Sequence, residues 1–467
     1  MAERPKTFHL PLQALAGLFI AIATCAYTAC SNSESVGNIN GSETSPIESA
    51  FNVHETADST TPASEAQQDQ PPSITKYIPL DDTEYPYAGI PRIVIETENR
   101  REIKDRETEI PAKLQIWGEK APESEIMELT IRGRGNTSWD EMPKKSYKIE
   151  FIKKQAMLGM PKDRDWALIA NYADKTLMKN FLAYHLAMDI GMSYAPRCKF
   201  IELFINKEYM GLYLLTETIK IAQNRINIPK GDFSYIIEFD NKVRESEQYF
   251  FSSTSIQRTP LRIHYPKNIS NESRNKIIAH IHKFESFLLT AYQDSLNEIR
   301  RWIDIEEFAK HYWIQEITKN PDTIYPTSVY FTWVDDKPIQ MGPVWDFDLA
   351  FGGHYKEDAA IYKGWRSKDY YWNEKLFANK MFEEKIHSFW FENETKFHQC
   401  FHTIDSLEKV IENAAANNFR KWNILRQNGI WISKPVENYN EAVLNLRHWY
   451  EKRVQWINEN INFHDSI

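Results

Sequence analysis

Two carboxylates stand two residues apart in an otherwise apolar stretch. The segment GPVWDFDLAFGG places Asp346 and Asp348 among Trp, Phe, Leu and Val. An unpaired carboxylate in such surroundings is costly unless it is protonated or meets a cation. Oxygen ligands at this spacing suit Mg²⁺ or Mn²⁺, which keep several waters and bridge the phosphates of a substrate. From the segment alone, one Asp capping a turn and the other pairing with an Arg is an equal alternative.

A third carboxylate precedes this pair. Asp322 lies in the sequence NPDT, which closes a predicted helix and precedes the predicted strand SVYFTW. One predicted hairpin separates Asp322 from Asp346. Protein kinases show the same order, with a catalytic Asp, a small hairpin and then a metal-binding Asp. By itself, NPD is equally typical of a turn that ends a helix.

A glycine-rich segment, RGRGNTSW, covers residues 132–139 between two predicted strands. Its glycines and Asn136 permit tight turns, and arginines such as Arg132 bind phosphate oxygens bidentately. The spacing is neither that of a Walker A loop nor that of the kinase glycine-rich loop. A β-turn whose polar side chains bind no ligand is therefore the alternative. In KKSYKIEF, which follows, Lys145 and Lys148 are candidates for the same pocket, although surface exposure is the usual fate of such lysines.

The elements that must position these residues divide the chain into two halves. Short alternating runs predict strands, and apolar residues at helical spacing predict helices. A helix is expected from a cap at Asp174 to Gly191, and hairpins are expected around Asn206–Lys207 and residues 335–337. The predicted strands are 91–97, 112–118, 127–133, 145–151, 198–206, 209–217 and 234–240, and the predicted helical stretches are 272–296, 304–320 and 440–462. The fold class is therefore α+β, with a β-rich N-terminal half and a helix-rich C-terminal half.

The composition is that of a globular protein, with 42% hydrophobic and 26% charged residues. The formal net charge of −9 is concentrated in residues 31–75, which hold seven acidic residues and no Lys or Arg. This Ser-, Thr- and Pro-rich segment cannot bury enough apolar surface to fold, so residues 30–75 are predicted to be a disordered acidic tether. The remaining body is near neutral, which argues against nucleic acid as a partner. No feature indicates an oligomeric state.

The N-terminus has the pattern of a secretory signal. Arg4 and Lys6 precede an apolar run that ends at Cys30. Small residues before Cys30 and a polar stretch after it resemble a bacterial lipoprotein box, although Tyr27 replaces the usual aliphatic residue and Cys25 is a second candidate. We expect residues 1–29 to be a lipoprotein-type signal peptide and Cys30 to carry the lipid anchor in the cell envelope. Ordinary secretion and an uncleaved anchor are the alternatives.

Only Cys198 and Cys400 remain in the body of the chain. Two cysteines do not form a disulfide framework. An oxidising compartment permits a bridge between them, and two buried thiols are the alternative.

Taken together, these segments resemble the CotH (spore coat protein H) family of atypical protein kinases. The resemblance extends over roughly residues 90–360 and rests on the order of several motifs. These are RGRGNTSW with KKSYKIEF, DWALIANYADKTLMKNFLAYHLA, FIELFINKEYMGLYLLTETIK, YIIEFD, NPDT and GPVWDFDLAFG.

The resemblance implies a divergent, two-lobed kinase-like domain over residues 76–467, with an N-lobe at about 85–217 and a C-lobe at about 218–467. It implies ATP with Mg²⁺ or Mn²⁺, and phosphoryl transfer to Ser or Thr of extracytoplasmic proteins. Within it, Asp322 resembles the catalytic Asp, and Asp346 and Asp348 resemble metal ligands. The resemblance also places Arg132, Asn136 and Lys148 over the phosphates and Glu217 where the lobes join.

One departure concerns the second metal. Thr327 and Ser328 occupy the region where the family often carries an Asn, and hydroxyls are poorer neutral ligands. A non-catalytic surface adhesin with the same fold is one rival function. A metal-assisted hydrolase of phosphate esters or glycans is another, although the chain contains no H-E-x-x-H.

Overall fold

The computed structural model describes residues 76–244, 248–324, 327–354, 357–429 and 433–461. The expected signal peptide and tether, with Cys25 and Cys30, lie outside these residues. Within them, none of the helices combines the length and the apolar character needed to cross a membrane.

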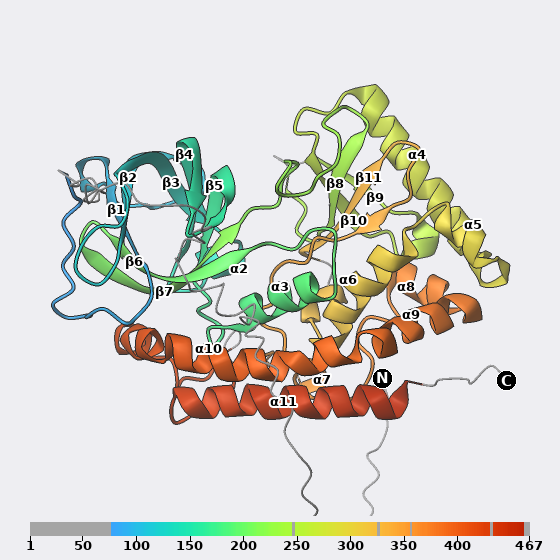
Figure 1. The fold of residues 1–467 in the computed structure, drawn as a ribbon. Helices are drawn as coiled ribbons and strands as arrows, with labels where there is room; N and C mark the ends of the chain where they lie inside the picture. Colours follow the sequence, from blue (N-terminus) through green and yellow to red (C-terminus); the bar gives the residue numbers. More distant parts are fainter. Residues whose placement is uncertain (1–75, 245–247, 325–326, 355–356, 430–432, 462–467) are drawn as a thin grey trace, which may run out of the picture. The chain divides into compact units, whose positions relative to one another are not determined.

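Seven strands of the N-terminal half close into a barrel with the order β1-β2-β3-β4-β5-β7-β6 (Figure 1). All neighbours are antiparallel except β1 and β6, whose parallel pairing closes the barrel. The strands are β1 (Arg92–Thr97), β2 (Ile110–Trp117), β3 (Met127–Arg134), β4 (Ser146–Met157), β5 (Met160–Ile169), β6 (Cys198–Ile205) and β7 (Glu208–Glu217).

Alternating side chains explain why these segments form a barrel. Along β3 and β4, Leu129, Ile131, Ile149 and Phe151 point inward and are buried in the core of the barrel. The polar residues between them point outward. The hairpin predicted at Asn206–Lys207 is confirmed, and both residues have the positive φ angles of a tight turn.

A second sheet of five strands has the order β12-β11-β8-β10-β9. Its central strand β8 is buried along its whole length, because strands pair with both of its edges and side chains cover both of its faces. The hairpin predicted around residues 335–337 is confirmed as the β11–β12 connection. The strands are β8 (Ser234–Phe239), β9 (Tyr249–Phe251), β10 (Pro260–Tyr265), β11 (Val329–Val334) and β12 (Gln340–Met341).

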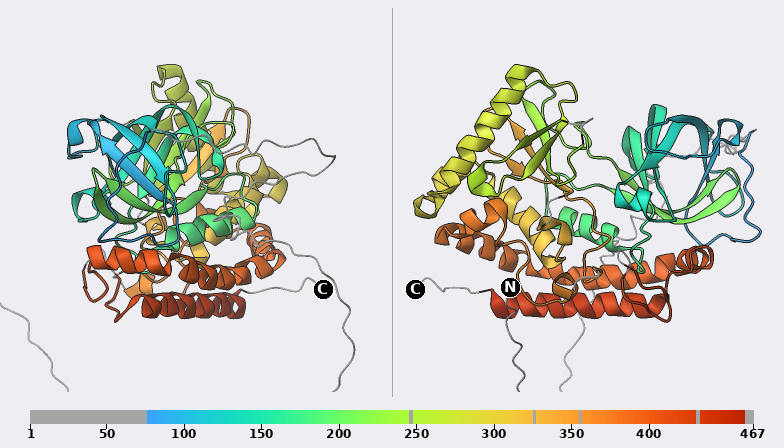
Figure 2. Two further views of the ribbon diagram at one scale, coloured as in Figure 1. Left: turned by 60° about the vertical axis from the view of Figure 1, so that its left-hand side comes forward. Right: turned by 180° about the vertical axis from the view of Figure 1, so that it is seen from behind.

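Helices dominate the C-terminal half, as predicted. The two longest, α10 and α11, pack side by side in every view, and α10 also packs against β7 and α3 (Figures 1 and 2). The helices are α2 (Thr137–Asp140), α3 (Lys179–Asp189), α4 (Asn271–Leu288), α5 (Leu296–Arg300), α6 (Ile305–Ile317), α7 (Glu357–Ala360), α8 (Tyr371–Phe377), α9 (Lys380–Glu392), α10 (Glu394–Lys421) and α11 (Tyr439–Asn460).

Helix α3 begins later than predicted. Asp174 does not cap the helix directly but organises the turn before it, where its carboxylate accepts hydrogen bonds from Thr176 and from the Lys179 N–H. The predicted end is confirmed, because Gly191 adopts a positive φ just beyond the last turn.

Candidate functional site

A cleft of about 500 Å³ lies where loops at one end of the barrel meet the second sheet. This volume is in the range of small-molecule and cofactor sites. The three predicted carboxylates, Asp322, Asp346 and Asp348, all line it. The other polar residues that line it are Arg134, Asn136, Thr137, Ser138, Lys144, Ser146, Asn171, Asn180, Glu238, Asn241, Lys242, Arg262, His264, Thr327, Ser328 and His354.

The segment that carries Asp346 is fixed by α3. The Phe347 N–H donates to Asn180 Oδ1 at 2.7 Å, and the Asp346 N–H lies 3.4 Å from the Tyr184 hydroxyl. Trp345 and Phe347 are buried, whereas the Asp346 side chain is exposed to the cleft. The apolar neighbours therefore anchor the segment, and the carboxylate faces the cavity.

Asp322 lies in a 3₁₀ turn, Pro321–Thr323, directly after α6. The Asn320 side chain caps this turn by accepting a hydrogen bond from the Asp322 N–H at 3.1 Å. The same side chain donates to the carbonyl of Asp346 at 3.4 Å. Asn320 thus ties the loop of Asp322 to the loop of Asp346, so NPD is at once a helix-ending turn and part of the cleft.

The three carboxylates hold more negative charge than their surroundings neutralise. Burial, with the charges of Asp346 and Asp348, raises the pKa of Asp322 well above its usual value. Burial also raises the pKa of Asp346, against the opposing charges of Arg134 and Lys242. Burial and the charge of Asp346 raise the pKa of Asp348 to about 8. The Asp346 carboxylate reaches water in the cleft, but the surrounding protein solvates it poorly, so a cation would relieve this excess.

The carboxylates fit a cation that takes only part of its ligands from protein. In the part of the chain that the structure describes, no three His, Cys, Asp or Glu side chains converge closely enough to hold a metal. Mg²⁺ and Mn²⁺ do not need such a cage, because one or two carboxylates, water and substrate phosphates suffice. Asp346 and Asp348 are the residues that would hold such an ion.

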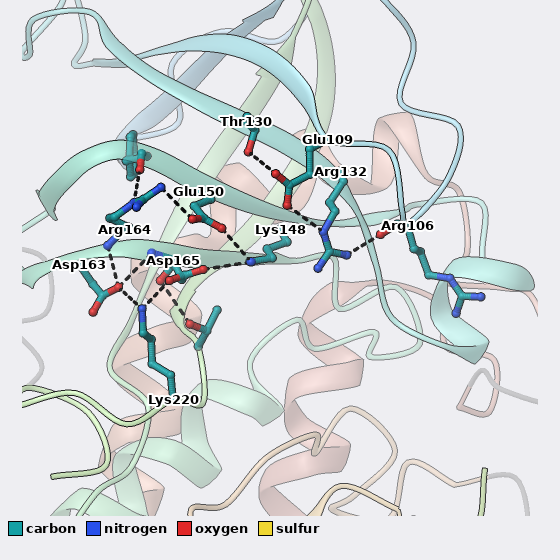
Figure 3. Close-up of polar contacts among 12 residues, drawn as sticks. Arg106, Glu109, Thr130, Arg132, Lys148, Glu150, Asp163, Arg164, Asp165 and Lys220 are labelled. Carbon is teal, nitrogen blue, oxygen red and sulfur yellow. Dashed lines mark hydrogen bonds and ion pairs between the residues drawn. The ribbon is translucent and has the colours of Figure 1, made fainter. Parts of the chain in front are cut away.

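The glycine-rich segment contributes Arg134 rather than Arg132 to the cleft. The Arg134 guanidinium lies 5.0 Å from the Trp345 ring. Burial lowers its pKa, against the charge of Asp346, which favours the charged form. Arg132 is two residues further from the strand end, and its guanidinium instead contacts the Arg106 carbonyl and, at 3.7 Å, Glu109 (Figure 3).

Lys148 lies in a charged network on the outer face of the barrel and is not among the residues that line the cleft. Its ammonium lies 3.0 Å from Asp165 and 3.2 Å from Glu150 (Figure 3). Lys220 approaches Asp165 and Asp163 from the chain that follows β7. Of the other predicted residues, Asn136 lines the cleft, whereas Lys145 donates to the Trp139 carbonyl.

A different lysine, Lys144, lines the cleft floor. Its ammonium donates to the backbone carbonyls of Ala170, at 2.7 Å, and Leu212, and to the side-chain oxygen Asn418 Oδ1 at 2.8 Å. Burial lowers the pKa of Lys144, but three carbonyl acceptors suit the three N–H groups of the charged form. The contact fastens the barrel to α10, and a Cβ at Gly211 would come within 2.6 Å of Asn418 Oδ1.

On the side of the cleft formed by the second sheet lie residues that the sequence did not indicate as part of a site. Glu238 on β8 accepts hydrogen bonds from the Ser328 N–H at 2.8 Å and from His264. Burial would raise its pKa, but His264 and Arg262 outweigh burial and lower it. A usable signal was present, because Glu238 stands in the apolar run SYIIEF, as Asp346 stands in its own.

Thr327 and Ser328 stand where the sequence departs from the pattern that it resembles, and they also line the cleft. The Ser328 hydroxyl hydrogen-bonds to Asp346 and favours its ionised form. A hydroxyl therefore stands beside a candidate metal ligand.

Glu217, at the end of β7, is buried in an ion-pair network. Its carboxylate contacts Arg197 at 2.8 Å, and it also contacts Arg225 and the Tyr194 hydroxyl. Burial nevertheless raises the pKa of Glu217, against the charges of Arg225 and Arg197. These contacts join the barrel to the chain leading into the second sheet and lie outside the cleft lining.

Cys198 and Cys400 are both free and buried. The alternative of two buried thiols is therefore the one observed. Burial raises the pKa of the Cys400 thiol to about 12, which makes its thiolate rare at neutral pH.

The charged network around Lys148 predicts a loss of stability in acid. Burial would raise the pKa of Asp165, but Lys220 and Lys148 outweigh it and lower the pKa. A carboxyl with a lowered pKa stabilises the fold above its unfolded pKa of about 3.9, and this contribution is lost as pH falls through the folded value. Asp165→Asn should therefore reduce the free energy of unfolding by about 1–2 kcal/mol at pH 7, and by less at pH 3.

Urea denaturation of the wild type and Asp165→Asn at both pH values measures this difference. Asp405→Asn, which changes a half-exposed carboxylate on α10, is the control and should stay within about 0.5 kcal/mol of the wild type. An effect of Asp165→Asn that is equally large at pH 7 and pH 3 would contradict the assignment to these ion pairs.

Comparison with known proteins identifies a family. A family model described as CotH kinase protein matches residues 131–457, well over half of the chain. The match begins within β3 and includes every residue that lines the cleft. No curated protein matches the chain.

Proposed function

Because the chain belongs to the CotH kinase protein family, we propose that it transfers the γ-phosphoryl group of ATP to Ser or Thr hydroxyls of proteins. In this proposal the barrel acts as the N-terminal lobe, and the second sheet with its helices acts as the C-terminal lobe, of a divergent kinase-like fold. The observation that carries the proposal is the convergence of Asp322, Asp346 and Asp348 in one cleft, opposite Arg134 and the glycine-rich segment.

Each residue has a role that fits its surroundings. Asp322 orients the acceptor hydroxyl and accepts its proton, a role consistent with its raised pKa. Asp346 and Asp348 would hold Mg²⁺ or Mn²⁺, and the ion would supply positive charge against the phosphate oxygens. Arg134 offers a planar pair of donors to the same oxygens. Asn136 and the backbone of the glycine-rich segment cover the phosphates.

The N-terminal sequence supports a proposal for the location of the activity. We propose that Cys30 anchors the chain by lipid in a bacterial cell envelope, and that residues 31–75 tether the domain. The acceptors would then be proteins outside the cytoplasm.

The proposal is tested with the purified chain by calorimetry of ATP binding, with and without Mg²⁺ or Mn²⁺. Transfer of radioactive γ-phosphate to a library of Ser- and Thr-containing peptides is then followed. We expect binding that requires the metal and transfer that requires Asp322. A folded chain that binds no ATP at millimolar concentration would refute the kinase proposal and favour a surface binding module.

A further inference from the structure

The loop after β8 brings two cations to the mouth of the cleft. Asp240 fixes the start of this loop, because its carboxylate accepts hydrogen bonds from the Lys242 N–H at 2.9 Å and the Tyr249 hydroxyl at 2.8 Å. Two residues further along the loop is Arg244. The side chains of Lys242 and Arg244 are thereby directed from the second sheet toward the barrel.

Both cations contact the glycine-rich segment through neutral partners. Lys242 Nζ donates to Thr137 Oγ1 at 3.0 Å, and Arg244 donates to Asn136 Oδ1 at 2.6 Å. Asn136 and Thr137 themselves line the cleft. Lys242 and Arg244 therefore bring positive charge to the glycine-rich segment from the side of the second sheet.

Lys242 differs from the lysines that sequence reasoning considered. The ammonium of Lys148 is engaged by two carboxylates, and that of Lys145 contacts a carbonyl on the barrel. Lys144 is saturated by three carbonyl oxygens. Lys242, by contrast, is exposed, lines the cleft, and donates to a neutral hydroxyl that a ligand oxygen can replace at little cost.

Lys242 also lines the same cleft as the carboxylates Asp322 and Asp346. An ammonium that shares this cleft with both carboxylates and contacts Thr137 lies where the phosphates of a nucleotide would join the metal ligands to the glycine-rich segment.

We propose that Lys242 contacts the β- and γ-phosphate oxygens of the bound nucleotide and that Arg244 positions its loop through Asn136. This inference rests on the proposed function and adds a residue to its site. Lys242 neutralises phosphate charge from the sheet side, while Arg134 does so from the barrel side.

The test compares ligands that differ only in their phosphates. The affinities of ATP and AMP, both with Mg²⁺, are measured by calorimetry for the wild type, Lys242→Ala and Lys242→Arg. Lys276→Ala is the matched control, because the Lys276 ammonium pairs with Asp335 and does not line the cleft. Inorganic tripolyphosphate with Mg²⁺ serves as a probe that lacks the nucleoside.

We expect Lys242→Ala to weaken ATP binding about tenfold or more while changing AMP binding less than about twofold. Lys242→Arg should recover most of the ATP affinity, and Arg244→Ala should cause a smaller loss. Lys276→Ala should match the wild type. Circular dichroism checks that every variant is folded.

Four outcomes would overturn the inference or separate it from the proposed function. Unchanged ATP affinity in Lys242→Ala, or equal losses for ATP and AMP, would show that Lys242 does not contact the outer phosphates. The wild type could bind tripolyphosphate, with an affinity that depends on Lys242, and show no binding of ATP. That result would support the phosphate contact and refute the kinase proposal. A folded wild type that binds neither ligand would refute both.

Discussion

Replacing Asp346 by Asn should strongly weaken metal-dependent nucleotide binding and leave the fold at least as stable as that of the wild type. The two effects have one physical cause. A carboxyl whose pKa is raised in the folded state is destabilising when ionised, because the fold prefers its protonated form. Burial and Asp346 together raise the pKa of Asp348, so removal of the Asp346 charge relieves a repulsion in the cleft.

The functional loss should be large, because the same charge would hold the metal. We expect the affinity for ATP with Mg²⁺ to fall at least about a hundredfold, and phosphoryl transfer to fall by more. Asn has nearly the shape of Asp, so the backbone contacts to Asn180 and Tyr184 and the hydrogen bond with Ser328 are retained. Calorimetry measures the binding, and urea denaturation at pH 7 measures the stability.

Asp405→Asn is the control for loss of a carboxylate outside the cleft and should change neither quantity appreciably. Wild-type ATP affinity in Asp346→Asn would remove this residue from the metal site. A large loss of stability would show that the carboxylate is structural, with its charge satisfied in the fold.

Most strands of the barrel were predictable because their signals are local, although β5 was not among the predicted strands. Alternating residues in β1 to β4 and tight turns such as Asn206–Lys207 reveal strands and hairpins within a few residues. Closure of the barrel was not predictable in this way. It depends on the parallel pairing of Arg92 with Glu202, two residues far apart in the chain, and no local pattern encodes that contact.

Strands β9 and β10 were missed for a related reason. The segment between Tyr249 and Tyr265 mixes aromatic, Ser, Thr and Arg residues, and the alternation is short. The strands form because β8, a fully buried strand, offers its edge to β10. Tertiary pairing, rather than intrinsic preference, decides the conformation here.

Within the site, the acids were predictable and most of the cations were not. A carboxylate in an apolar run is conspicuous, since burying it requires a compensating partner, and this reasoning found Asp346 and Asp348. A lysine or arginine on a strand carries no such signal. Whether Arg132 or Arg134 reaches the cleft depends on where β3 ends, and the presence of Lys242 in the cleft lining depends on a loop that follows a strand of the second sheet.

The largest effect on stability is expected from Arg453 on α11, a helix whose sequence indicated packing alone. Arg453 and Glu316 are both fully buried and pair at 2.7 Å. Arg453 also donates to the carbonyls of Tyr362 and Gly364, each at 2.8 Å. Burial lowers the pKa of Arg453 to about 10, and the charge of Glu316 opposes this change.

The pair anchors the chain that follows Asp348. The Glu316 carboxylate accepts hydrogen bonds from the Arg366 and Ser367 N–H groups, each at 2.6 Å. Three residues after Glu316, Lys319 donates to carbonyls in the same segment, including that of Asp358 at 3.0 Å. Two helices thus hold this segment against the loop that carries Asp322.

Arg453→Met should reduce the free energy of unfolding by about 3–5 kcal/mol, because it leaves the Glu316 charge buried without its partner. Arg447→Met on the same helix is the matched control. Arg447 is 38% exposed and pairs with Asp405, which is 41% exposed, so a change of about 0–1 kcal/mol is expected. Urea denaturation of both variants measures the difference.

A second substitution separates the charge from the packing. In Arg453→Met with Glu316→Leu the isolated charge is gone, so part of the stability should return, as happens when buried ion pairs give way to apolar groups. Recovery should be incomplete, because the N–H groups of Arg366 and Ser367 lose their acceptor. If the double variant were no more stable than Arg453→Met, the cost would lie in the lost hydrogen bonds to the segment after Asp348, and the uncompensated Glu316 charge would not be its cause.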